Sequence, residues 1–111
     1  VVLNEGLQKI GEGAFFECSS LESIIFSSSI SEIGDGAFGK CSNLKDVVLN
    51  EGLRKIGEGA FFECSSLESI KFPSTVSEIS EAAFGKCRLL KDVVLNEGLR
   101  KIGKAAFYKC S

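Results

Sequence analysis

A repeat of 23 residues runs through the whole sequence and limits the possible folds more than any other feature. Residues 1–23 and 47–69 differ at a single position, Gln8 against Arg54. A unit this short cannot bury its apolar side chains alone, whereas stacked units share a continuous core. The repeat therefore predicts a single solenoid domain over residues 1–111, with one coil for each copy. The five coils are residues 1–23, 24–46, 47–69, 70–92 and 93–111, of which the last is incomplete.

The apolar spacing within each copy predicts the path of a coil. Leu44-x-x-Val47-x-Leu49 follows the pattern that is typical of leucine-rich repeats. Alternate side chains of a strand point to opposite faces, so Val47 and Leu49 should be buried. A second short strand or turn at Leu53–Gly57 should lead into a helical turn that carries Phe61. We therefore predict an α/β solenoid, a right-handed superhelix with a parallel concave β-sheet and short turns or helical turns on the convex side.

Two runs of residues point to a more specific class. One is Ile33-Gly34-x-x-Ala37-Phe38-x-x-Cys41, which has an equivalent in every copy. The other is Ile70-x-Phe72-Pro73-x-x-Val76-x-x-Ile79. In both, the chain resembles the BspA-like class of leucine-rich repeat proteins, and the resemblance covers its whole length. Members of this class are typically surface or secreted adhesion proteins of bacteria and protists, so the resemblance implies a binding role without naming a ligand.

The sequence also departs from related repeats at two positions. The family proline occurs only as Pro73, and the equivalent positions hold Asn4, Ser27, Asn50 and Asn96. The position of the asparagine ladder in ordinary leucine-rich repeats holds Gly6, Ser29, Gly52, Thr75 and Gly98. The three glycines follow Asn-Glu pairs, where we expect turns with positive φ.

Charge and size alternate between neighbouring copies, so the full period is two coils. We call residues 1–23, 47–69 and 93–111 the odd coils and residues 24–46 and 70–92 the even coils. Opposite charges in register favour the stacking of unlike coils and disfavour a slip by one coil. The alternating charges are Lys9, Glu32, Lys55, Glu78 and Lys101; Glu22, Lys45, Glu68 and Lys91; and Glu17, Lys40, Glu63 and Lys86, before Lys109 breaks the third row. Core size is expected to alternate at Leu3, Phe26, Leu49, Phe72 and Leu95, and at Phe16, Gly39, Phe62, Gly85 and Tyr108.

Each copy contains one cysteine, and the five are Cys18, Cys41, Cys64, Cys87 and Cys110. Zinc sites need closely spaced pairs such as C-x-x-C, which the sequence lacks. Neighbouring coils could bring two cysteines within disulfide range. The odd count and the parallel, inward direction of the side chains favour free thiols in the core instead.

Other candidate chemistry has a simpler structural explanation. The sequence has no histidine, so the commonest general base is missing. Gly34–Gly39 matches G-x-G-x-x-G, but no βαβ unit surrounds it. The acidic row could bind a cation, although a solvated face is the more ordinary reading. We predict no enzyme activity, no cofactor and no metal. The row is Glu12, Asp35, Glu58 and Glu81, and it ends in Lys104.

Charge and hydropathy exclude two classes of partner. Thirteen basic and fifteen acidic residues give a net charge of -2, which argues against nucleic-acid binding. No apolar stretch approaches the length of a membrane span, and the first residues do not resemble a signal peptide. The compartment stays open, although the family resemblance favours a cell-surface or secreted protein.

One surface row is the candidate partner site. It alternates with the buried strand residues and should line the concave sheet, beside a polar row. An apolar stripe with a polar rim suits a protein partner; β-branched residues chosen for strand propensity explain the same stripe. The row is Val2, Ile25, Val48, Lys71 and Val94, and its flanking residues include Asp46 and Asp92.

Both ends of the predicted stack lack a polar capping unit. Three explanations are open: an excerpt from a longer array, end-to-end association with another subunit, or coverage by a partner. We therefore expect a module for protein–protein or adhesion-type binding, or alternatively a structural scaffold held through its ends. The residues expected to be bare are Val1, Leu3, Leu7, Ile10 and Phe15 at one end, and Val93, Leu95, Leu99, Ile102 and Phe107 at the other.

Overall fold

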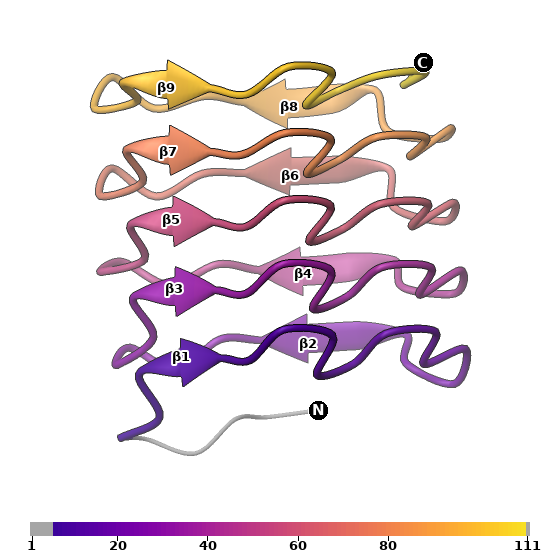
Figure 1. Cartoon of the computed structure of the whole chain (residues 1–111), viewed down its shortest axis with the longest axis horizontal. Helices are drawn as coiled ribbons and strands as arrows, with labels where there is room; N and C mark the ends of the chain where they lie inside the picture. Colours follow the sequence, from indigo (N-terminus) through magenta and orange to yellow (C-terminus); the bar gives the residue numbers. More distant parts are fainter. Residues whose placement is uncertain (1–5, 111) are drawn as a thin grey trace.

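The computed structural model of the chain describes residues 6–110, which form a stack of similar coils (Figure 1). Five two-residue strands lie on one side of every coil and build one parallel sheet in the order β1-β3-β5-β7-β9. Their bounds are β1 Lys9–Ile10, β3 Glu32–Ile33, β5 Lys55–Ile56, β7 Glu78–Ile79 and β9 Lys101–Ile102. Four three-residue strands lie on the other side of the coils (Figure 1). These are β2 Ser23–Ile25, β4 Asp46–Val48, β6 Ser69–Lys71 and β8 Asp92–Val94.

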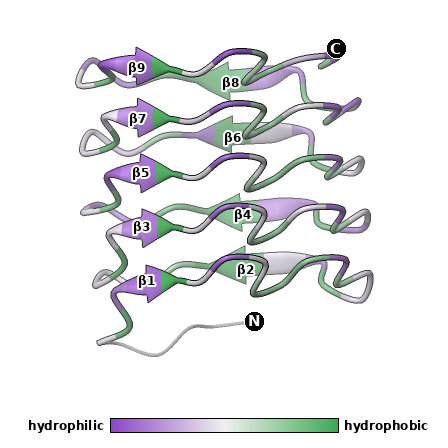
Figure 2. Cartoon of the chain, in the orientation of Figure 1, coloured by the Kyte–Doolittle hydropathy of each residue, from purple (hydrophilic) through white to green (hydrophobic). Residues whose placement is uncertain are grey.

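Strand register follows the sequence repeat. Every pairing is parallel and joins equivalent positions of successive copies, as in Lys9 opposite Glu32 and Glu32 opposite Lys55. Successive copies of the repeat therefore lie in register along the described residues. Within the strands of the five-stranded sheet, a charged residue precedes an isoleucine, and Figure 2 shows this change from hydrophilic to hydrophobic.

The expected concave sheet is not continuous. Strand β2 pairs with β4 and β6 pairs with β8, but no pairing joins β4 to β6 in the described part of the chain. Ile24 and Ile70, in the middle of β2 and β6, are buried, whereas Val47 and Val93, in β4 and β8, are only half-buried. The smaller valine side chains of the odd coils fill this layer less completely, so the prediction that Val47 and Leu49 are buried was too strong.

Of the two forms predicted for the convex side, short turns are present and helical turns are not, because residues 6–110 contain no helix. Each coil has positive φ at two positions four residues apart, as at Gly59 (61°) and Glu63 (58°), and an α-helix cannot continue through such residues. The backbone amides instead reach the next coil, and the Phe61 N–H donates to the Ala83 carbonyl at 2.7 Å. The α/β class is corrected to a solenoid of parallel strands and turns. It follows that none of the described residues belongs to a helix that could cross a membrane.

Stacked phenylalanines form the centre of the core. The rings of Phe38 and Phe61 lie 5.2 Å apart between centroids and are nearly parallel, as are those of Phe61 and Phe84 at 5.1 Å. Phe15 and Phe107 continue the same stack at its two ends. The spacing matches offset aromatic stacking, with one ring contributed by each coil. The predicted aromatic core ladder is confirmed.

Of the two predicted large-and-small rows, one lies in the core, where Phe26 and Phe72 are buried and Leu49 packs against the core, and the other lies at the surface. Phe16 is about half exposed, and its ring lies across Gly39 of the next coil, where a Cβ would be only 2.9 Å from a ring carbon. Phe62 lies in the same way across Gly85. The next lysine caps each ring, with Lys40 Nζ 5.9 Å from the Phe16 centroid. Glycine is therefore required in the even coils because an aromatic side chain occupies its space.

The alternating charges are in register but seldom touch. Among the described residues, the only ion pair within 4 Å joins Lys9 Nζ to Glu32 Oε2, at 3.8 Å. The predicted register of opposite charges is confirmed for the row from Lys9 to Lys101. In the row of Glu17 and Lys40, the lysine lies over an aromatic ring instead. Such exposed charges affect which coils stack more than the total stability.

Asparagines bridge each even coil to the odd coil that follows. The Asn50 side-chain amide donates to the Ile30 carbonyl of the preceding coil at 2.7 Å, and it is buried. Asn96 donates in the same way to Val76 at 2.9 Å. The Asn50 Oδ1 has no hydrogen-bond partner among the described residues. These asparagines stand where the family proline would be, and the sequence analysis missed their role.

Hydroxyl groups make the bridge from each odd coil to the following even coil. The Thr75 Oγ1 accepts from the Gly52 N–H at 2.9 Å and donates to the Leu53 carbonyl at 2.7 Å. Ser29 joins Gly6 and Leu7 with the same geometry. The two kinds of junction therefore use different chemistry at the same place in the coil.

Two of the three turn glycines have the expected conformation. Gly6 and Gly52 adopt φ values of 98° and 107°. The prediction is wrong for Gly98, which is not among the residues with positive φ. Gly98 is required for another reason, because a Cβ there would lie 2.7 Å from the Ser74 carbonyl oxygen of the preceding coil.

Candidate binding face

The outward side chains of β2, β4, β6 and β8 form a face that we call the β2–β8 face. Each of these strands has three residues, and its middle side chain points into the core. The first and third side chains therefore point outward. The strand pairing keeps the outward residues aligned, with Ile25 opposite Val48 and Lys71 opposite Val94.

The third positions of the strands make a mostly apolar row. Ile25, Val48 and Val94 are 51%, 53% and 52% exposed, which is high for β-branched side chains within strands. Lys71 is exposed and interrupts the row. Val2 lies outside the described residues. The structure thus brings together four of the five residues that the sequence suggested for this row.

The first positions of the same strands make a parallel polar row. Asp46 and Asp92 are exposed and pair in register with Ser23 and Ser69. The two carboxylates give this edge of the β2–β8 face a negative character. An extended apolar centre beside an acidic edge can bind apolar side chains that are accompanied by basic groups.

The cysteines are free thiols, as predicted. Each of the last four donates a weak hydrogen bond to a phenylalanine carbonyl, as from Cys64 Sγ to Phe38 at 3.2 Å. Burial raises the pKa of the Cys41 thiol, so this group is protonated at neutral pH. A protonated, buried thiol is a poor nucleophile and metal ligand.

The glycine-rich run and the acidic row both have structural roles. A Cβ at Gly34 would lie 2.7 Å from the carbonyl oxygen of Ile10 in the preceding coil, and Gly36 has a φ of 63°. Asp35 Oδ1 accepts a hydrogen bond from the Glu58 N–H of the next coil at 2.8 Å. No group of three or more cysteine or acidic residues within residues 6–110 is arranged to hold a metal ion.

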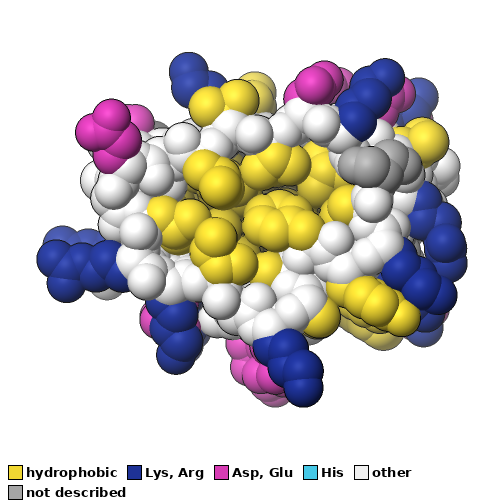
Figure 3. All heavy atoms as spheres, turned by 90° about the horizontal axis from the view of Figure 1, so that it is seen from above, with side chains coloured by type: hydrophobic (Ala, Val, Ile, Leu, Met, Phe, Trp, Pro, Cys, Tyr) yellow, Lys and Arg dark blue, Asp and Glu magenta, His cyan; other side chains and the backbone are white. Residues whose placement is uncertain are grey.

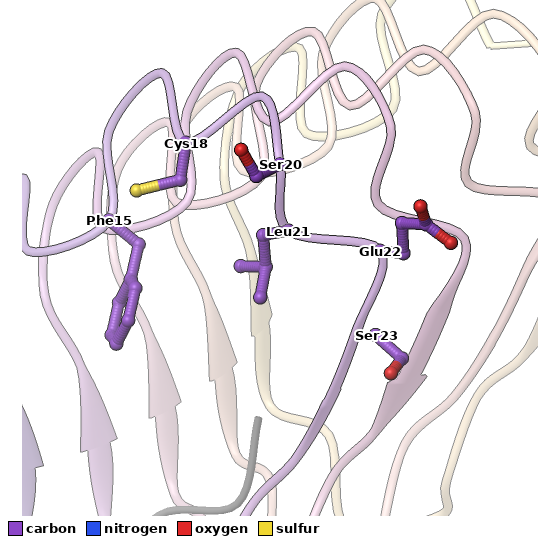
Figure 4. A pocket seen from close by; sticks show the side chains of 6 residues that line it. All are labelled: Phe15, Cys18, Ser20, Leu21, Glu22 and Ser23. Carbon is purple, nitrogen blue, oxygen red and sulfur yellow. The ribbon is translucent and has the colours of Figure 1, made fainter.

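A pocket of about 430 Å³ opens at the N-terminal end of the stack (Figure 4). Phe15, Cys18 and Leu21 give it an apolar wall, and Ser20 and Glu22 lie toward its polar side. All of these residues come from the first coil. The pocket is therefore part of the end of the stack, and at Ser23 it meets the edge of the β2–β8 face.

The two ends of the stack are not equivalent. Ile10, in β1, is 3% exposed, whereas its equivalent Ile102, in β9, is 49% exposed. The expectation that Ile10 faces solvent is therefore wrong. At the C-terminal end, Leu95 and Tyr108 are also about half exposed, and Figure 3 shows the hydrophobic side chains gathered in the middle of that surface. Val1 and Leu3, expected to be bare at the other end, lie outside the described residues.

A comparison with protein families decides the class of the molecule. Residues 1–111 match the model described as "BspA type Leucine rich repeat region (6 copies)". The chain belongs to the BspA-type leucine-rich repeat family. No curated protein matches the sequence of this BspA-type chain.

Solved structures of bacterial leucine-rich repeat proteins resemble the fold. A leucine rich repeat protein from T. pallidum is 38% identical, with a TM-score of 0.94 over 97% of this chain and 53% of that one. A leucine rich cell surface protein from Faecalibacterium prausnitzii is 30% identical, with a TM-score of 0.94 over 98% of this chain and 29% of that one. A Bacteroides ovatus protein is also 30% identical, with a TM-score of 0.75 over 98% of this chain and 34% of that one. The BspA-type chain thus spans about half or less of these relatives.

Proposed function

We propose that the chain is a non-catalytic binding module and that its β2–β8 face binds a protein partner. The observation that carries this proposal is the aligned row of half-exposed Ile25, Val48 and Val94 beside the acidic Asp46 and Asp92. Exposed apolar side chains in register offer a surface whose burial favours association. The partner would supply apolar side chains to the row and basic groups to the two carboxylates.

An adhesion-type role at a cell surface is consistent with this proposal. The Faecalibacterium prausnitzii relative is described as a leucine rich cell surface protein. The described residues of this chain offer neither a histidine nor a metal-holding cluster for catalysis. A repeated, rigid face with half-exposed apolar groups favours recognition over chemistry.

A random peptide display library, selected on the immobilised chain, tests the β2–β8 face. Selected peptides should be rich in apolar and basic residues, and they should lose binding to a Val48→Asp, Val94→Asp variant. Leu89→Asp is the matched control, because Leu89 is 51% exposed but lies in a turn outside the strands. Peptides that bind the double variant as well as they bind Leu89→Asp would contradict the proposal and would leave strand propensity as the reason for the row.

A structural or scaffold role is the second candidate, and the exposed C-terminal end favours it. In that case a charge in the end, as in Leu99→Asp, would break assembly while the β2–β8 face variant would leave it intact. Leu99 is half-buried in the last coil. The two roles are therefore separated by where a charged substitution abolishes association.

A further inference from the structure

The internal junctions show what an odd coil contacts in the even coil above it. A lysine of the odd coil stands opposite a glutamate, as Lys9 does with Glu32 at 3.8 Å. An aromatic ring of the odd coil covers a glycine, as Phe62 covers Gly85. A turn of the odd coil binds a hydroxyl group of the even coil. A backbone N–H of the turn donates to the hydroxyl oxygen, and the hydroxyl donates to a backbone carbonyl of the turn, at both odd-to-even junctions.

The C-terminal end presents the odd-coil half of all three contacts. Lys101 extends the row of Lys9 and Lys55, and Tyr108 stands where Phe16 and Phe62 stand. Both side chains are exposed. Gly98 and Leu99 occupy the position of the turn that receives a hydroxyl group at the other odd-to-even junctions, although Gly98 lacks the positive φ of Gly6 and Gly52.

Backbone N–H and carbonyl groups at this end are also placed to form hydrogen bonds with a further coil. In earlier coils the phenylalanine amide donates to the next coil, as the Phe61 N–H does to Ala83, and the isoleucine carbonyl accepts, as Ile56 does from Ser80. The equivalent groups are the Phe107 N–H and the Ile102 carbonyl. Neither has a backbone hydrogen-bond partner among residues 6–110. Ile102 is 49% exposed, so these groups lie at the surface of the end, and a further coil would pair both of them as the next coil does at the internal junctions.

We propose that the C-terminal end is a docking surface for one further coil of the even type. This coil carries a carboxylate opposite Lys101, a glycine opposite Tyr108, and a serine or threonine hydroxyl opposite the Gly98 turn. It buries the exposed Ile102, as Ile56 is buried in the third coil, and it covers part of the exposed Leu95 and Tyr108, as Leu49 and Phe62 are half-buried there. Specificity comes from the three matched positions, and affinity comes from the apolar centre seen in Figure 3.

A second copy of the chain does not satisfy this surface with its N-terminal end. That end is an odd coil, so stacking it here sets Lys9 against Lys101 and Phe16 against Tyr108. The first is a like-charge contact, and the second places an aromatic ring where the internal junctions have glycine. Gly6 also brings no hydroxyl group. The surface is therefore selective between coil types and disfavours head-to-tail chains of identical copies.

Tyr108 gives a direct readout, because the chain has one tyrosine and no tryptophan. We would extend the full chain with a copy of Ser66–Ser69, which completes the last coil, followed by a copy of either Ile24–Asp46 or Val47–Ser69. The first extension is even and the second is odd. The measurements are acrylamide quenching of Tyr108 fluorescence and the melting temperature.

The even extension should lower the quenching constant, because it brings Tyr108 to the half-buried state of Phe62, and it should raise the melting temperature, whereas the odd extension should do neither. The matched control is the even extension with Gly39→Phe and Glu32→Lys in the appended copy, which should behave as the odd one does. Equal protection of Tyr108 by both extensions, or protection by neither, overturns the proposal. So does concentration-dependent protection of Tyr108 in the unextended chain, because it would show association between identical copies.

Discussion

Odd-to-even and even-to-odd junctions alternate along this solenoid and hold their coils together in different ways. From an even to an odd coil, the outer strands pair, as β2 does with β4, and a buried asparagine such as Asn50 reaches back to the preceding coil. From an odd to an even coil, β4 and β6 do not pair, and the contacts are the Thr75 hydroxyl and an aromatic ring over glycine. The five-stranded sheet runs through both kinds.

This difference shows that the structural unit is a pair of coils. The repeat of 23 residues sets the height of one coil, but the full set of contacts recurs only every second coil. Each even coil is tied to the following odd coil on both sides of the stack. Neighbouring pairs are joined by the continuous sheet, the hydroxyl bridge and the aromatic–glycine contact.

The largest expected effect comes from removing coils in different numbers. Deleting Ile24–Asp46 puts Phe16 against Phe62 and Lys9 against Lys55, whereas deleting Ile24–Ser69 puts Phe16 against Gly85 and Lys9 against Glu78. The longer deletion should therefore melt at the higher temperature, although it leaves the shorter chain. Thermal unfolding followed by circular dichroism measures both. Equal melting temperatures would show that all coils are interchangeable.

The phenylalanine stack should not distinguish the two kinds of coil. Its ring spacings are nearly uniform, at 5.0 to 5.4 Å, and the central rings are fully buried. Phe38→Ala in an even coil and Phe61→Ala in an odd coil should each cost about 3–5 kcal/mol of unfolding free energy. Urea titration measures both values. A clear inequality would mean that the difference between coil types extends into the core.

Asn50 and Thr75 test the polar bridges of the two junctions. Asn50→Asp replaces the donor that faces the Ile30 carbonyl with a buried carboxylate, so it should cost about 3 kcal/mol at neutral pH. The exposed Thr75 is a milder test, and Thr75→Val should cost about 1 kcal/mol. Urea titration at pH 7 compares them. A smaller cost for the Asn50 variant would argue against a stronger polar bridge at the even-to-odd junction.

The smallest expected effect is a gain in stability. Ala82 has a φ of 55° where earlier coils carry Gly36 and Gly59. Ala82→Gly should stabilise the chain by about 1 kcal/mol, because glycine adopts this conformation without a Cβ penalty. The neighbouring Ala83 is buried and is not among the residues with positive φ, so Ala83→Gly is the matched control and should destabilise. Chemical denaturation that ranks the two variants in the opposite order would exclude backbone strain at Ala82.

Periodicity allowed much of this architecture to be predicted from the sequence. A repeat fixes which residues become neighbours, so it predicted the strand register, the phenylalanine stack and the free thiols. The pairing of Lys9 with Glu32 and the contact of Phe16 with Gly39 also followed from the two-coil period. The aligned row of Ile25 and Val48 was predicted in the same way, although its partner-binding role is a proposal.

Local backbone conformation was the part that periodicity could not supply. The predicted helical turns are absent because charged residues such as Glu63 adopt positive φ, a conformation that these residue types do not predict. The asparagine bridges were missed because Asn50 was interpreted only as a missing proline. Its alternation with Ser27 and Pro73 was a visible signal of two junction types. No repeat pattern specifies the missing pairing between β4 and β6.

Hydrogen exchange of single backbone amides tests the two-coil unit most directly. The Phe26 N–H donates to the Val48 carbonyl and the Phe72 N–H to the Val94 carbonyl, both at 3.0 Å across even-to-odd junctions. The equivalent amide at the odd-to-even junction, that of Leu49, has no backbone hydrogen-bond partner among the described residues. The account predicts that Leu49 exchanges much faster than Phe26 and Phe72 under native conditions. Equal protection of the three amides would contradict it.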